Sequence, residues 1–78
     1  MKDIVLTDYM HYRAKLRGYD LERIEEILRF GTEKYFDSET GRHVVVGSHR
    51  HKLVLIPYEE TETKITPVTV HAKRFKHE

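Results

Sequence analysis

The chain changes its hydrophobic period once, near residue 32, and this change limits what it can fold into. Before it, apolar residues recur every three or four positions, as on one face of an α-helix. From Glu33 onward they alternate with polar residues, as in a β-strand. Helices followed by strands predict an α+β fold with the helices on one face of an antiparallel sheet. At 78 residues we expect one domain, residues 1–78, with one small core.

The first predicted helix begins at Thr7 or Asp8 and runs to about Arg17. Thr and Asp are both good N-cap residues, and Gly18 supplies a residue that tolerates positive φ at the C-terminal end. The large apolar side chains fall at helical spacing on one stripe: Tyr9, Tyr12 and Leu16.

The second predicted helix has the clearer pattern. Asp20 is a good N-cap, Tyr19 before it can pack against Ile24, and Gly31 ends the helix. Its charged residues face water, whereas its buried stripe consists of Leu21, Ile24, Ile27 and Leu28.

Four segments with period two predict an antiparallel meander of four strands, at residues 33–36, 42–47, 52–58 and 64–72. Residues 2–6 can add an N-terminal strand, and Pro67 suits an edge position or a bulge. Two helices cover only one face of such a sheet, yet residues 44–46 and 53–56 are apolar on both faces. We therefore expect a C-terminal segment, a second copy of the chain or a partner protein on the other face.

Composition excludes several classes of protein. The chain has no cysteine, so it has neither disulfides nor thiolate metal sites. It has no apolar run of about 18 residues and no signal peptide pattern, so we expect a cytoplasmic protein that does not bind membranes. Residues 1–39 carry seven Lys/Arg and nine Asp/Glu, and residues 40–78 carry seven and four. The net charge is therefore −2 for the first half and +3 for the second half, which has a mild basic bias.

His71 is the first candidate for chemistry. Along the last strand Val68 and Val70 point one way, so if they face the helices, His71 lies on the open face with Lys73 and Arg74 nearby. Neighbouring cations lower the pKa of an imidazole, which suits a general base near neutral pH. The alternative is a strand-end histidine with a structural hydrogen bond only.

The connection of residues 48–51 predicts a basic hairpin tip. Arg50, His51 and Lys52 could hold phosphates there, and the alternative is an ordinary solvated turn. His49 and His51 have His-x-His spacing, but no carboxylate completes a zinc set, so we expect no metal and no cofactor. Tyr58 ends the third strand, where it packs in the core or presents its hydroxyl at the rim.

Several segments in order resemble the RelE/ParE-like superfamily, especially its BrnT-type and related toxin-like domains. They are His11-x-Arg13, residues 18–28, Tyr35-Phe36-Asp37, residues 44–47 and residues 66–72. The resemblance covers about residues 11–72. It implies a helix pair on an antiparallel sheet and the toxin of a type II toxin–antitoxin pair, restrained by a cognate antitoxin protein. Such toxins are typically metal-independent endoribonucleases (mRNA interferases), free or on the ribosome, whereas ParE-type members inhibit DNA gyrase.

RNA cleavage without a metal needs a base, an acid and cations around the phosphate. Local chemistry assigns these roles to His71 as base or acid and to His51 as the second proton-transfer group. The expected RNA-binding residues are Arg50 and Arg74 on phosphates, Lys52 and Lys73 as supporting cations, and Tyr58 for base stacking or proton donation. The alternative is a non-enzymatic interaction module of the same fold, acting as a homodimer through the exposed sheet face or as an antitoxin-binding protein.

Overall fold

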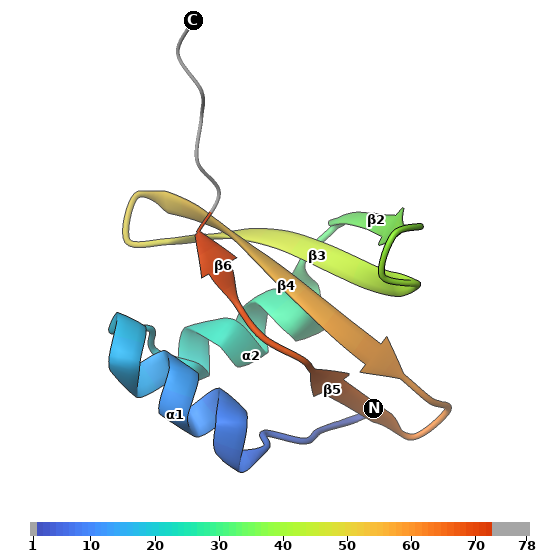
Figure 1. The fold of residues 1–78 in the computed structure, drawn as a ribbon, viewed down its shortest axis with the longest axis horizontal. Coiled ribbons are helices and arrows are strands. Elements are labelled where there is room, and N and C mark those ends of the chain that lie inside the picture. The colour runs from blue at the N-terminus through green and yellow to red at the C-terminus, as the bar shows by residue number, and fades with distance from the viewer. Residues whose placement is uncertain (1, 73–78) are drawn as a thin grey trace, which may run out of the picture.

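Both helices begin and end where their capping residues predict. In the computed structural model, which describes residues 2–72, α1 spans Asp8–Arg17 and α2 spans Leu21–Phe30 (Figure 1). The Thr7 hydroxyl accepts a hydrogen bond from the Met10 amide, and the Asp20 carboxylate accepts one from the Glu22 amide. Gly18 is left-handed, at φ 73°. The two helices are therefore joined by a tight, capped turn.

The sheet is mixed and has more strands than the predicted antiparallel meander. A short N-terminal strand, β1, pairs in parallel with β5, and the order is β1-β5-β4-β3-β2, with β6 also on β4. The strands are β1 (Asp3–Ile4), β2 (Glu33–Asp37), β3 (Arg42–His49), β4 (Lys52–Glu60), β5 (Lys64–Pro67) and β6 (His71–Ala72).

The predicted last strand, 64–72, is divided by a bulge. Tyr58 pairs with Pro67 and Leu55 pairs with His71, so residues 68–70 lie opposite only two residues of β4. The extra residue reverses the alternation, and Pro67 and Val70 both enter the core. The expected alternation through Val68 and Val70 is therefore wrong. Pro67 itself pairs with Tyr58 in a strand that has neighbours on both sides, and the extra residue comes just after it.

The core lies between α2 and one face of the sheet. Ile24, Ile27 and Leu28 of α2 pack with Val45, Val54, Ile56 and Val70 of the strands, and Met10 of α1 joins them. The helix comes so close to β3 that a Cβ at Gly47 would lie 2.6 Å from side-chain atoms of Ile27. Within residues 2–72 no helix is long and apolar enough to cross a membrane.

The other sheet face carries no helix within the described residues (Figure 1). On this face Val46, Leu53, Leu55 and Pro57 are only half-buried, whereas Val44, which pairs with Pro57, is buried.

The large apolar residues of α1 are not part of the core. Tyr9, Tyr12 and Leu16 are 51%, 62% and 59% exposed, and the buried residues of this helix are the smaller set Met10 and Ala14. Because α2 fills most of the covered sheet face, α1 contacts the core along one side only.

Candidate functional site

The basic hairpin tip is tighter than the sequence predicts. β3 continues to His49, so only Arg50 and His51 form the turn, with φ of 50° and 69°. Positive φ at both central residues is the geometry of a two-residue turn that normally takes Asn-Gly. Lys52 follows at once as the first residue of β4. All three side chains are exposed.

His49 fixes this hairpin to the turn between the helices. Its side chain is 5% exposed, its Nε2 accepts a hydrogen bond of 2.9 Å from the Asp20 amide, and its ring meets the Tyr19 ring edge to face at 5.3 Å. Because Nε2 is the acceptor, the neutral ring carries its proton on Nδ1. Arg23 of α2 adds a second tie, donating to the Ser48 carbonyl at 2.8 Å.

These ties bring the end of α1 beside the hairpin. Between them lies a shallow pocket of about 180 Å³. Its lining comes from the helix turn and the hairpin: Arg17, Gly18, Tyr19, His49, Arg50 and Lys52.

His71 lies in an adjoining pocket of about 150 Å³, formed by α1 and the edge strand β6. Its neighbours there are Arg13, Arg17, Tyr19 and Ala72. Arg13 Nε donates to the Val70 carbonyl at 3.4 Å, which holds the guanidinium beside β6. Partial burial, and then the charge of Arg13, lower the pKa of His71. The neutral imidazole, which can accept a proton, is therefore favoured.

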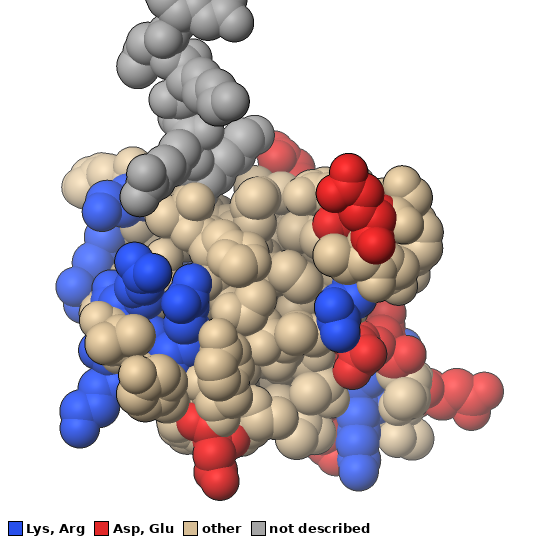
Figure 2. All heavy atoms as spheres, viewed as in Figure 1, with Lys and Arg blue, Asp and Glu red and all other residues tan. Residues whose placement is uncertain are grey.

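The two pockets share Arg17 and Tyr19 and form one surface. We call its four permanent cations the basic cluster: Arg13, Arg17, Arg50 and Lys52. Figure 2 shows Lys and Arg gathered on the side of the molecule where α1 ends and the β3–β4 hairpin turns. The described residues that line the two pockets include no carboxylate. Such a surface is suited to an anion with several negative charges, such as an RNA backbone.

Several predicted site residues do not join His71. Lys73 and Arg74 lie outside the described residues. His51, in the hairpin turn, is four residues along the chain from Leu55, the partner of His71, and strand geometry makes this about 13 Å. His71 and His51 are therefore too far apart to act on the two oxygens of one phosphodiester.

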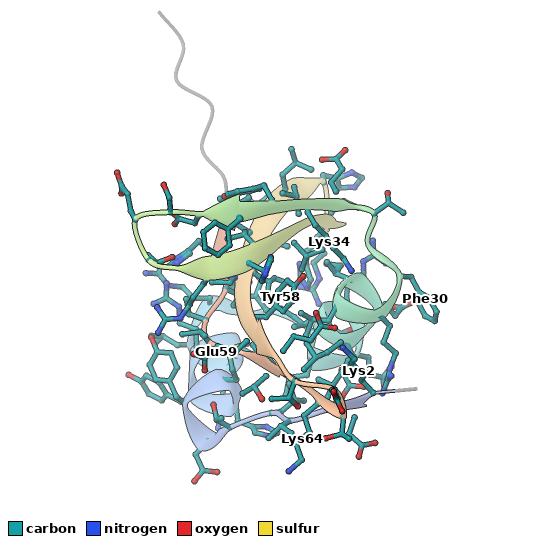
Figure 3. All side chains as sticks on the ribbon, turned by 90° about the vertical axis from the view of Figure 1, so that its right-hand side faces the viewer. Lys2, Phe30, Lys34, Tyr58, Glu59 and Lys64 are labelled. Carbon is teal, nitrogen blue, oxygen red and sulfur yellow. The ribbon has the colours of Figure 1, made fainter. Side chains whose placement is uncertain are left out.

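Tyr58 lies at the opposite end of β4, in the core. Its side chain is 5% exposed and stacks on His43, with ring centroids 6.0 Å apart. Burial, and then the charge of Glu60, raise the pKa of its hydroxyl. Figure 3 shows it with Lys2 and Lys34, on the side of the molecule away from the basic cluster. Its position does not support the predicted roles in base stacking and proton donation.

Sequence reasoning missed three members of the site: Arg13, Arg17 and Tyr19. The signal that could have found them is the Gly18 turn. A left-handed glycine reverses the chain, and here the Tyr19 amide bonds back to the Ala14 carbonyl at 2.8 Å. Tyr19 is thereby placed next to the basic last turn of α1.

Within residues 2–72 no group of three or more His, Asp or Glu side chains is arranged to hold a metal ion. No family model, curated protein or solved structure matches the chain. The function is therefore inferred from the geometry of the site.

Proposed function

We propose that the protein is a toxin-type, metal-independent endoribonuclease that acts through His71 and the basic cluster. One observation carries the proposal. Arg13 and Arg17 line the pocket of His71, Arg50 and Lys52 line the adjoining pocket, and neither lining includes a carboxylate. The cations would bind the RNA backbone, and the histidine would supply the base.

The reaction that fits is attack of a ribose 2′-oxygen on the adjacent phosphorus. His71 takes the 2′-hydroxyl proton as the new P–O bond forms, and Arg13 and Arg17 stabilise the extra negative charge of the phosphorane. The bond to the 5′-oxygen then breaks, and this oxygen takes a proton from Tyr19, the hydroxyl donor that lines both pockets. The products are a 2′,3′-cyclic phosphate and a free 5′-hydroxyl. Transfer of the proton from His71 to Tyr19 through water resets the site.

The toxin part of the proposal is supported by the sequence resemblance. A toxin of this kind would be held inactive by a cognate antitoxin protein that covers the basic cluster. Its RNA substrate would be free or bound to the ribosome.

The test is cleavage of a labelled single-stranded RNA in excess EDTA by purified protein. Wild type should produce fragments ending in 2′,3′-cyclic phosphate, and His71→Gln should cleave at least about 100-fold more slowly, because a positioned general base contributes that much. His11→Gln is the matched control, since His11 is an exposed histidine of α1 that lines neither pocket. Binding without cleavage would overturn the enzymatic proposal, and absence of RNA binding would overturn the whole of it.

A second candidate function rests on the open sheet face. A hollow of about 530 Å³ on this face is lined by Val46, Leu53 and Leu55, together with the polar and aromatic residues Thr32, Glu33, Lys34 and Tyr35. A half-exposed apolar face is typical of a protein-binding surface, so the alternative is a non-enzymatic module that binds a second copy or an antitoxin. Dimerisation of wild type in sedimentation, lost in Leu53→Glu, together with no RNA binding would favour it.

A further inference from the structure

The outward face of α1 carries an apolar stripe without a partner in the described part of the chain. It consists of Tyr9, Tyr12 and Leu16, which we call the tyrosine stripe. The three side chains are 51%, 62% and 59% exposed, and their i, i+3, i+7 spacing places them on one side of the helix. Neither the covered sheet face nor the proposed reaction uses them.

The tyrosine stripe borders the basic cluster directly. At about 100° per residue, Arg13 lies about 40° around the helix from Tyr9, and Arg17 a further 40° in the same direction. Arg13 and Arg17 line the His71 pocket. The helix therefore presents, side by side, a row of tyrosine rings and a row of guanidinium groups that leads into the candidate site.

From this juxtaposition we infer that the tyrosine stripe stacks the unpaired bases of single-stranded RNA whose phosphates bind the basic cluster. The inference rests on the proposed function, because it assumes that the anion held by the cluster is RNA. Proteins bind single strands with two components, cations for the phosphates and exposed aromatic rings for the bases. Any base can stack on such a ring, because every base has a flat face. The bases of a duplex are already stacked on each other, so the surface selects single strands over duplexes.

The charges around the stripe disfavour a second copy of the chain as the occupant. Arg13 and Arg17 border it on one side, and Lys15 lies on the other side, about 60° from Tyr12. Asp8 of the first turn also lies on that side, about 40° from Tyr12, so three cations and one carboxylate flank the stripe. Two such helices packed together would bring more like charges than opposite charges into proximity. A polyanion with apolar faces, which single-stranded RNA is, complements both the cations and the rings.

The experiment compares two fluorescently labelled probes of equal length and charge, a 12-residue oligouridylate and its abasic ribose-phosphate analogue. We expect Tyr9→Leu and Tyr12→Leu each to weaken binding of oligouridylate about tenfold and to leave binding of the abasic probe unchanged, because leucine keeps apolar area but cannot stack as an aromatic ring does. Tyr12→Phe should bind like wild type. Tyr35→Leu, which changes a 47% exposed tyrosine on β2, is the matched control and should bind both probes normally.

Each outcome separates this inference from the proposed function. If the leucine variants bind oligouridylate as wild type does, or lose both probes equally, the stacking role is overturned. The proposed function stands in that case provided that Arg17→Gln weakens both probes. If wild type binds neither probe, both proposals fail. An acidic amphipathic peptide could instead bind the tyrosine stripe without occupying the basic cluster. If it does, and oligouridylate does not bind the stripe, the stripe is a protein-docking surface and the inference is wrong.

Discussion

Two features of the surroundings of His71 change its pKa in the same direction. Partial burial disfavours the charged ring, and Arg13 adds repulsion, so both lower the pKa from its ordinary value of 6.5. The register places His71 opposite Leu55, on the other face from Val70, and its side chain remains exposed. The sequence predicted this exposed position, but it expected Lys73 and Arg74 as the neighbouring cations. The cation that the structure provides is Arg13, which is 58 residues away in the chain and could not be found by strand alternation.

The first prediction concerns the titration of His71. Its NMR midpoint should lie below 6.5 in the folded protein and should rise in Arg13→Gln without reaching 6.5, because burial is the larger cause. Between the two pKa values the folded ring is neutral while the unfolded ring is protonated. The contribution of His71 to the free energy of unfolding therefore falls as the pH drops from about 6.5 to the lower pKa of the folded state. Cleavage should increase with pH through the same midpoint if His71 is the base. A midpoint unchanged in Arg13→Gln would contradict the proposed contact.

At the scale of elements, the positions of the two helices could be predicted from the sequence. Which of their faces are buried could be predicted only in part. Asp20, the Gly18 turn and three of the four residues of the α2 stripe were predicted correctly, because caps and amphipathicity are local properties. The fourth, Leu21, is only half-buried. Apolar spacing on α1 identified the tyrosine stripe but could not tell whether that side faces the core or solvent. The prediction for the last strand, residues 64–72, failed for a related reason. A single bulged residue reverses the alternation, and only the pairing with β4 shows where it falls.

The hairpin turn gives the second prediction. Arg50 and His51 occupy left-handed conformations that cost non-glycine residues about 1–3 kcal/mol each. His51→Gly should raise the free energy of unfolding by about 1 kcal/mol and keep RNA affinity, since Arg50 remains. The double variant Arg50→Asn, His51→Gly introduces the preferred Asn-Gly turn. It should be at least as stable as His51→Gly but should bind RNA more weakly. Denaturant unfolding and RNA titration measure the two effects, and a double variant that is stabilised with unchanged RNA affinity would remove Arg50 from the site.

On the scale of the whole molecule, the distribution of charge matters more than its sum. The net charge is only +1, and the half of the chain before residue 40 carries −2. Yet Arg13 and Arg17, two members of the basic cluster, come from that half. The hydrogen bond from the Asp20 amide to His49 and the bond from Arg23 to Ser48 hold the two halves in this arrangement. A count along the sequence therefore located the basic bias in the second half only, because it could not include cations that the fold brings across from α1.

The third prediction follows from this convergence of charge. If each member of the cluster neutralises one phosphate, the logarithm of the RNA association constant should fall with the logarithm of salt concentration with a slope of about −0.7 per contact, or about −3 for four. Arg17→Gln should make the slope shallower by about 0.7 and weaken binding of all single-stranded sequences alike, since a phosphate contact carries no base information. Lys64→Gln removes an exposed cation on β5 that lines neither pocket, and it should leave the slope unchanged. Equal effects of the two substitutions would mean that RNA responds to the overall charge of the protein. The proposal that the RNA runs past the end of α1 would then be wrong.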